Sequence, residues 1–376
     1  MKIALYIHIP FCVSKCYYCD FLSYSKSTLQ ASYTDALIKE IQNHAKKLGK
    51  TYSVKSIFIG GGTPTVLPPL LLDRICEAIT CYFRLDVGAE WTIESNPGTI
   101  TKDIISVIKT YPITRISLGL QSTHNRLLKA IGRIHTFAEW EQSFYLLKEH
   151  TTCDINSDIM FALPTQTMNE FKDTLKKLTD FSLDHLSLYA LIIEEGTKFG
   201  DLYNKGELKL VDEVIDREMY HYAKDYLKEI GYKQYEISNW AKEGKACKHN
   251  ILYWEREDYI GIGLGAHSFF ENIRYHNEDN LEKYIEMDGN LSLLKLEEES
   301  ITREMAMQEF MFLGLRMTKG ISMQSFYKTF GVDIFDVYKS QLDKWIKHHI
   351  LVKSKDDIAL SDYGMDVCNE VFSSFL

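Results

Sequence analysis

Short runs of β-branched and apolar residues alternate with longer stretches of helical period through the first half of the chain. Six such runs are predicted to be strands, and they occupy residues 3–10, 56–60, 91–95, 115–120, 154–161 and 185–191. Strands that alternate with helices are typical of an α/β fold in which crossover helices cover a parallel sheet. Because eight units close a complete (β/α)8 barrel, six units predict an open, partial (β/α)6 TIM-like barrel. We expect the functional residues at the carboxyl ends of its strands.

Three cysteines, Cys12, Cys16 and Cys19, follow the first strand in the spacing CxxxCxxC, with no fourth cysteine close by in the sequence. A cubane [4Fe–4S] cluster has four iron corners, so three thiolates leave one corner open to a small molecule. The spacing therefore predicts such a cluster. Two alternatives are a structural zinc site, for which His8 is the nearest spare donor, and thiols with a purely structural role.

Composition and charge exclude several classes of protein. The net charge of −9 argues against a nucleic acid partner, because such proteins present a basic field to the phosphate backbone. No apolar run is long enough to span a bilayer. Eight cysteines in 376 residues are too sparse for a disulfide scaffold, and Met1 leads into a strand without a signal-peptide pattern. We therefore expect a soluble protein of the cytoplasm.

The second half of the chain changes character twice. A helix after residue 212 is followed by strand-like segments at 235–240, 251–254 and 259–270, and helices then dominate beyond residue 300. Two short strands, at 350–352 and 358–360, flank a polar turn near the end. We therefore predict a barrel over 1–230, a β-rich extension over 231–299 and a small helical, winged-helix-like domain over 300–376. That last domain has nine Lys or Arg against ten Asp or Glu, which favours a packing or partner role over DNA binding.

Polar and glycine-rich residues lie at the predicted carboxyl ends of several strands. The loop GGGTPT at 60–65 allows close backbone approach, so we expect its N–H and hydroxyl groups to face an amino-acid carboxylate or ammonium group. A tight turn without a ligand is the alternative. Glu94 and Asp158 lie in apolar strands, where a carboxylate is costly unless it is paired. They either bind a ligand or form ion pairs with Arg115 or Arg133.

The motif YIHIPFC at residues 6–12, together with CxxxCxxC and GGGTPT, resembles a known family. It is similar to the radical S-adenosylmethionine (SAM) proteins related to oxygen-independent coproporphyrinogen III oxidase, and the similarity covers nearly the whole chain. In that family the amino and carboxylate groups of SAM chelate the open iron of the cluster. The resemblance implies SAM contacts by Tyr6, Tyr18, Gly61, Gly62, Thr63, Glu94, Gln121, Arg133, Asp158 and Ala190.

Two departures from the oxidases indicate the branch of this family. The oxidases carry a further cysteine two places after the third ligand, where this sequence has Phe21. They also have an N-terminal extension over the active site, whereas eleven residues precede Cys12 here. Both features resemble the haem chaperone branch, whose members bind haem and deliver it to acceptor proteins.

The segment HNILYW at 249–254 also resembles the HNxxYW signature of the haem-binding branch. Imidazole is a common axial ligand of haem iron, and aromatic neighbours can cover the porphyrin face, so His249 is the candidate haem ligand. An ordinary histidine in a half-buried strand is the alternative. Cys247 is not part of a C-x-x-C-H haem attachment pattern. His267, after a glycine-rich strand, either approaches SAM or haem or packs.

Two functional hypotheses follow. The first is a haem chaperone whose cofactors are haem, SAM and a [4Fe–4S] cluster. Its expected partner is a haem-accepting protein, and an electron donor and a second copy of the chain are further possible partners. The second is a SAM-dependent coproporphyrinogen III oxidase, in which the cofactor carries the difficult chemistry. A different radical SAM reaction, with HNxxYW only structural, is a third possibility. The residues do not decide whether the chain is an enzyme.

Overall fold

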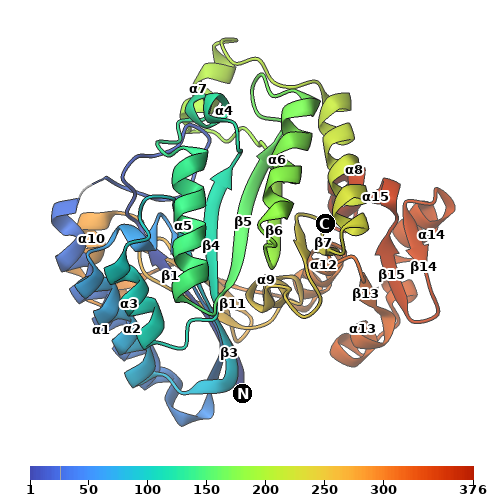
Figure 1. Cartoon of the computed structure of the whole chain (residues 1–376). Coiled ribbons are helices and arrows are strands. Elements are labelled where there is room, and N and C mark those ends of the chain that lie inside the picture. Colours follow the sequence, from blue (N-terminus) through green and yellow to red (C-terminus); the bar gives the residue numbers. More distant parts are fainter. Residues whose placement is uncertain (26) are drawn as a thin grey trace.

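The computed structural model describes residues 1–25 and 27–376, and its centre is one large, mostly parallel sheet (Figure 1). Over this described part the sheet has twelve strands in the order β12-β11-β10-β9-β1-β2-β3-β4-β5-β6-β8-β7. The six central strands are β1 (Lys2–Ile9), β2 (Ser53–Gly61), β3 (Leu85–Ser95), β4 (Arg115–Gln121), β5 (Asp154–Phe161) and β6 (His185–Ala190).

These six strands confirm the predicted open (β/α)6 barrel. They are parallel and follow one another in sequence order, so all their carboxyl ends lie along the same edge. Helices cover the outer face of the sheet (Figure 1). Those of the barrel are α1 (Gln30–Leu48), α2 (Pro69–Tyr82), α3 (Lys102–Thr110), α4 (Asn125–Ala130), α5 (Phe137–His150), α6 (Met168–Asp180), α7 (Lys198–Asn204) and α8 (Glu213–Glu229).

Local sequence explains where several of these helices start and stop. Helix α1 buries the apolar stripe that includes Tyr33, Leu37 and Ile41, and it ends at Gly49, whose positive φ of 60° suits glycine. Helices α5 and α6 both begin with a capping box, in which a threonine and a glutamate three residues later satisfy each other's backbone N–H groups.

The region after α8 extends both edges of the sheet. Strand β8 pairs antiparallel with β6 at one edge, and β9 pairs parallel with β1 at the other. The elements here are β7 (Lys233–Glu236), β8 (Asn239–Ala241), α9 (Lys248–Trp254), β9 (Tyr259–Ile262), β10 (His267–Phe270), β11 (Ile273–Asn277), α10 (Leu281–Glu286), α11 (Leu291–Leu294) and β12 (Lys295–Ser300).

The predicted strand at 251–254 is wrong, because this segment belongs to helix α9. Glu90 of β3 lies at the start of that helix and accepts hydrogen bonds from the backbone N–H groups of Lys248 (3.0 Å) and His249 (2.9 Å). A carboxylate there satisfies otherwise unpaired donors and interacts favourably with the helix dipole. The apolar pattern of 251–254 does not reveal this distant cap.

The C-terminal part forms a separate lobe beside α8, at the right of Figure 1. This lobe has its own apolar core around Phe326, Leu342 and Ile358, and its strands β14 and β15 pair as a hairpin. The predicted small helical, winged-helix-like domain is therefore confirmed. His221 of α8 contacts Asp366 of this lobe at 2.9 Å. Its elements are α12 (Arg303–Gly314), β13 (Ile321–Ser322), α13 (Met323–Phe330), α14 (Ile334–Lys347), β14 (Leu351–Lys353), β15 (Asp357–Leu360), α15 (Asp362–Asp366) and α16 (Cys368–Ser373).

Within the described residues, the model has no helix that combines the length and the apolar character needed to cross a membrane.

A buried carboxylate, Glu40 of α1, ties the barrel to the extension at the β9 edge. Its side chain accepts hydrogen bonds from the backbone N–H of Gly263 (3.0 Å), the amide of Asn277 (2.7 Å) and the hydroxyl of Tyr284. Glu40 is fully buried. Loss of this carboxylate leaves several buried donors without an acceptor.

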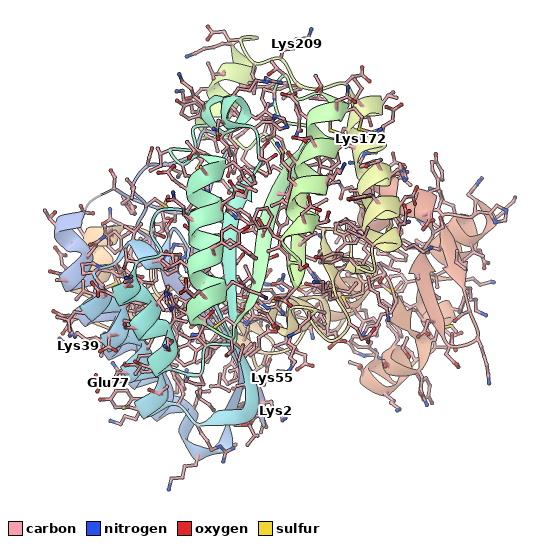
Figure 2. The ribbon with its side chains drawn as sticks, viewed as in Figure 1. Lys2, Lys39, Lys55, Glu77, Lys172 and Lys209 are labelled. Carbon is pink, nitrogen blue, oxygen red and sulfur yellow. The ribbon has the colours of Figure 1, made fainter. Side chains whose placement is uncertain are left out.

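We expect Glu40→Ala to lower the free energy of unfolding by about 3 kcal/mol, because the donors around Glu40 stay buried and lose their charged acceptor. Chemical denaturation measures this. Glu77→Ala is the control, since Glu77 is exposed on α2 at the outside of the molecule (Figure 2), and we expect a change within about 0.5 kcal/mol. Equal stabilities of the two variants would contradict the prediction.

Candidate functional site

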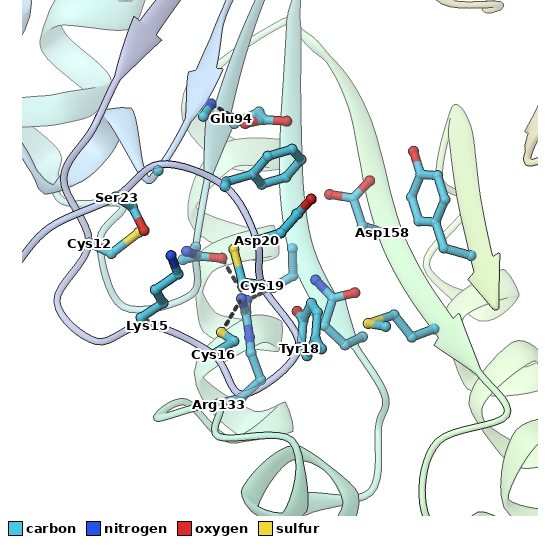
Figure 3. Close-up of a pocket in the computed structure, with 18 of the residues that line it drawn as sticks. Cys12, Lys15, Cys16, Tyr18, Cys19, Asp20, Ser23, Glu94, Arg133 and Asp158 are labelled. Carbon is cyan, nitrogen blue, oxygen red and sulfur yellow. Dashed lines mark hydrogen bonds between the residues drawn. The ribbon is translucent and has the colours of Figure 1, made fainter. Parts of the chain in front are cut away.

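A cavity of about 390 Å³ lies at the carboxyl ends of the barrel strands (Figure 3). Cys12, Cys16 and Cys19 all line it, on the loop that follows β1. Glu94 of β3 and Asp158 of β5 reach the same cavity from the sheet. The structure therefore brings these predicted site residues together at the carboxyl edge of the sheet.

Backbone hydrogen bonds hold the cysteine loop at both ends. At its base, the N–H of Cys12 donates to the carbonyl of Tyr24 (3.0 Å), and the N–H of Tyr24 donates to Pro10 (2.8 Å). Near its tip, the N–H of Tyr17 donates to Ile131 (3.0 Å), and the carbonyl of Tyr17 accepts from Phe199 (2.8 Å). The loop is thus attached to the barrel on two sides, which orders the thiols before any ligand binds.

A chain of side-chain contacts joins two of the three cysteines. Cys12 Sγ lies 3.5 Å from Thr63 Oγ1, which accepts a hydrogen bond from Asn96 at 2.6 Å. Arg133 donates to Asn96 Oδ1 (2.6 Å) and to the sulfur of Cys16 (3.6 Å; Figure 3). The Arg133 guanidinium therefore places a positive charge beside the thiols, and a positive charge favours the thiolate form that binds metal.

The arrangement of the thiols bears on the zinc alternative. Among residues 1–25 and 27–376, no three His, Cys, Asp or Glu side chains come close enough together to hold one metal ion. His8 is also engaged: its Nε2 donates to the carbonyl of Leu22 (2.8 Å), and its Nδ1 accepts from Tyr6 (3.0 Å). In a cubane each thiolate binds a different iron, so the three sulfurs do not have to converge on one point. The donor set fits a cluster better than a single zinc ion.

Burial also affects the thiols themselves. It raises the pKa of Cys12, and it raises the pKa of Cys19 to about 11. Because iron binds the thiolate, loading of this site is expected to release protons.

The glycine-rich loop differs from expectation in one respect. The backbone N–H of Gly61 donates to Glu94 (3.0 Å), while those of Gly62 and Thr63 donate to Ile9 (2.9 Å) and Phe11 (2.7 Å). The prediction that these N–H groups face a ligand is therefore wrong, because they fasten the loop to β1 and β3. The glycines are needed for this close approach: a Cβ at Gly62 would lie 2.6 Å from the carbonyl oxygen of Phe11.

Among the described residues, neither of the two carboxylates that face the cavity forms an ion pair with an arginine. The carboxylate of Asp158 accepts hydrogen bonds from Asn156 (2.8 Å) and Ser117 (3.0 Å), and Glu94 accepts the Gly61 N–H. Burial and then repulsion from Asp158 raise the pKa of Glu94 to about 8, and burial raises the pKa of Asp158. Arg115, one suggested partner, instead lies 3.7 Å from Glu90. Two acids held together in this way favour a cationic ligand.

The structure brings most of the predicted SAM contacts together. Eight of the ten line the first cavity: Tyr18, Gly61, Gly62, Glu94, Gln121, Arg133, Asp158 and Ala190. Thr63 lies behind Cys12, and Tyr6 lines a neighbouring cavity. Sequence reasoning missed Asn96 and Tyr189. Asn96 directly follows β3 and Tyr189 is the last but one residue of β6, so each lies beside a predicted contact at a strand end, and this position was the available signal.

The neighbouring cavity, here called the second cavity, has a volume of about 660 Å³. Its walls are rich in aromatic rings, and it meets the first cavity at four residues that line both: Asp20, Phe21, Gly61 and Glu94. The lining aromatic side chains are Tyr6, Phe21, Phe58, Tyr253, Trp254, Tyr259 and Phe269. A volume of this size is typical of sites for small organic ligands or cofactors.

His249 lies in the wall of the second cavity, and it is 1% exposed. Its Nδ1 contacts the hydroxyl of Ser56 (2.8 Å) and its Nε2 contacts the hydroxyl of Tyr253 (2.9 Å). Burial lowers the pKa of His249 to about 3, so the ring is neutral at pH 7. Haem ligation by His249 requires one of these hydrogen bonds to break.

Comparison with known proteins supports the same class. A model of the radical SAM superfamily matches residues 6–178, and a model of the HemN C-terminal domain matches residues 301–367. Proteins named Heme chaperone HemW are similar over nearly their whole length. That of Lactococcus lactis is 36% identical over 372 residues (99% of this chain, 96% of the relative), and that of Escherichia coli is 31% identical over 379 residues (100% and 98%).

A solved structure shares the fold. The coproporphyrinogen III oxidase HemN from Escherichia coli, a radical SAM enzyme, matches with a TM-score of 0.86 at 19% identity, covering 100% of this chain and 90% of that chain. This identity is low enough that the likeness concerns the fold alone.

The barrel and its thiol-lined cavity define a radical SAM protein, a class whose cofactors are SAM and a [4Fe–4S] cluster. Within that class, the chain belongs to the HemW family. The residues present fit these cofactors. Three thiols are available for the cluster, and Arg133 donates a hydrogen bond to one of them, Cys16. Two carboxyl groups, those of Glu94 and Asp158, face the same cavity and suit the cationic SAM.

We expect Gly62→Ala to reduce cluster loading, because its Cβ would clash with the carbonyl oxygens of Ile9 and Phe11 and displace the cysteine loop, at a cost of about 1–3 kcal/mol. Iron and sulfide per chain after anaerobic reconstitution measure the effect. Gly206→Ala is the control, since a Cβ at Gly206 meets no atom within 4 Å and adds only the strain of an alanine at a positive φ of 72°, which Gly62 does not have. Full loading of the Gly62→Ala variant would contradict the prediction.

The raised pKa of Glu94 also predicts that the stability of the protein depends on pH. Its folded pKa of about 8 lies above the ordinary value of 4.5, so its contribution to stability is fully present below pH 4.5 and is lost as the pH rises through 8. We expect Glu94→Gln to make the melting temperature of the metal-free protein fall less steeply over this window. Parallel curves for the wild type and the variant between pH 4.5 and pH 8 would refute this assignment.

Proposed function

We propose that this chain is a haem chaperone, which binds haem in the second cavity and passes it to an acceptor protein. Cys12, Cys16 and Cys19 hold the cluster, and SAM lies in the first cavity among the predicted contact residues. The observation that carries the proposal is the aromatic second cavity of about 660 Å³ that adjoins the cysteine-lined one. The names of the relatives, Heme chaperone HemW, support the same conclusion.

The first cavity suits SAM because of its charge. SAM carries an ammonium group and a sulfonium centre, and the carboxyl groups of Glu94 and Asp158 lie opposite the cysteine loop (Figure 3), where a bound cation favours their ionised forms. Burial and then repulsion from Asp158 raise the pKa of Glu94, and a bound cationic ligand offsets the repulsion. A cluster held by Cys12, Cys16 and Cys19 would leave one iron open to the amino and carboxylate groups of SAM, in the cavity that Glu94 and Asp158 also line.

The second cavity suits a porphyrin because its walls are aromatic and its rim is basic. Tyr253 and Tyr259 pack edge to face, with ring centroids 4.6 Å apart, and both rings line the cavity as apolar surface for a porphyrin. Arg256 and Arg274 line the same cavity and share one carboxylate partner, Glu309 (2.6 and 2.8 Å). Asp20 and Glu257 line the cavity too, and Glu257 pairs with Lys55, so the two guanidinium groups provide a local cationic region at the Phe269 ring for the propionates of haem.

Haem release has to involve a partner that reaches this cavity. Phe21, which lines both cavities, is 59% exposed, so the boundary between them lies open to another molecule. An acceptor protein is the partner that the proposal requires. An electron donor for the cluster and a second copy of the chain are further proposed partners.

We expect one haem per chain on titration of the purified protein, and weaker binding by roughly tenfold or more in Leu313→Trp, because the larger ring intrudes into the second cavity that Leu313 lines. The Soret absorbance and quenching of protein fluorescence measure binding. Leu293→Trp is the matched control, since Leu293 is 55% exposed and does not line this cavity. Equal haem affinity in both variants would place haem elsewhere.

The oxidase alternative has its own assay. Reconstituted protein is incubated anaerobically with reductant, SAM and coproporphyrinogen III, and the porphyrinogen products are separated. A chaperone leaves coproporphyrinogen unchanged, whereas formation of protoporphyrinogen would overturn the proposal. A second assay follows haem loss from the loaded protein to apomyoglobin, which reports whether bound haem can leave.

A further inference from the structure

Three histidines line the second cavity, and they differ in whether their ring nitrogens are available. Both nitrogens of His8 are engaged, by Tyr6 (3.0 Å) and the carbonyl of Leu22 (2.8 Å). Both nitrogens of His249 are engaged as well, by Ser56 (2.8 Å) and Tyr253 (2.9 Å). An imidazole needs a free nitrogen lone pair to bind iron, so neither ring is ready to act as a ligand.

His267, the third histidine, is different. It is the first residue of β10, it is exposed, and its ring makes no hydrogen bond within the part of the chain that the structure describes. Its ring contact is with His276 of β11, with centroids 5.1 Å apart. His276 itself is engaged, because its Nδ1 donates to the carbonyl of Asn277 (2.9 Å) and its Nε2 lies 3.5 Å from Glu297.

The sheet places His267 beside the basic rim of the cavity. His267 and Phe269 are two residues apart on β10, so their side chains lie on the same face of the sheet. Across the antiparallel pair, His276 lies opposite His267, and Arg274 lies opposite Phe269. Arg256 lies over the Phe269 ring at 4.5 Å and Arg274 at 5.7 Å. The free imidazole of His267 and the guanidinium of Arg274 therefore lie on one face of the β10–β11 hairpin, and Arg256 packs against that face from the segment after α9.

The charges around the ring favour its neutral form. Although its side chain reaches solvent, the part of the ring covered by the protein lowers the pKa of His267, and the neighbouring His276 and Arg274 lower it further, while Glu297 acts in the opposite direction. A neutral imidazole is the form that coordinates metal.

We propose that His267 is the axial ligand of the haem iron in the second cavity, with Arg256 and Arg274 paired to the haem propionates. This inference rests on the proposed function, and it assigns His249 to the wall of the cavity instead of to the iron. His249 then shapes the site through its hydrogen bonds to Ser56 and Tyr253.

The test compares ferric-haem complexes of the full-length protein by absorption and electron paramagnetic resonance spectroscopy. We expect His267→Ala to lose the imidazole-ligated spectrum of the wild type and to regain it with added free imidazole. We expect His249→Ala and His276→Ala to keep that spectrum. His276→Ala is the matched control, because it removes an imidazole directly across the hairpin that does not line the cavity.

A second variant at His267 replaces the imidazole with another large side chain, so that loss of the iron ligand is separated from loss of side-chain volume. His267→Tyr supplies a phenolate, which also ligates ferric haem, so we expect a distinct phenolate-type spectrum. A wild-type spectrum in both His267 variants, or loss of the imidazole signal only in His249→Ala, would overturn the assignment of His267. Absence of haem binding in the wild type would instead overturn the proposed function.

Discussion

Arg133 connects the cysteine loop to the barrel, and the site depends on this connection. Its guanidinium reaches the sulfur of Cys16, the side chain of Asn96 after β3 and the carbonyl of Gly119 in β4 (2.8 Å). Asn96 in turn holds Thr63, which contacts Cys12. One charged side chain therefore sets the position of the loop relative to three strand ends, and it places a positive charge where thiolates must form.

The same edge of the sheet also accounts for the closeness of the two cavities. Strand β1 has β2 on one side and β9 on the other, so the ends of the barrel strands and the extension meet around it. Gly61 and Glu94 then line both cavities. A ligand in the first cavity that changes the charge of Glu94 also changes the wall of the second. If SAM and haem occupy the two cavities as proposed, this shared wall gives a physical route by which each affects the binding of the other.

Much of the fold follows from patterns in the sequence, while the details of the site do not. The apolar stripe of α1 and its terminal Gly49 are local features, so the helix could be predicted from them. Helix α9 could not, because its N-terminus is capped by Glu90, 159 residues away from His249. The glycine loop was placed correctly at the end of β2, but the use of its N–H groups depends on Ile9, Phe11 and Glu94.

By itself, the sequence determined the parallel barrel, the loop with three thiols and the set of polar residues at the strand ends, because apolar periodicity and residue spacing report burial directly. Only the tertiary structure decided which groups remain free to bind. His249 stands in the more conspicuous motif, yet Ser56 and Tyr253 occupy its nitrogens, whereas those of His267 have no such partner among the described residues. The reason is that hydrogen-bond occupancy depends on contacts between distant segments, which periodicity does not record.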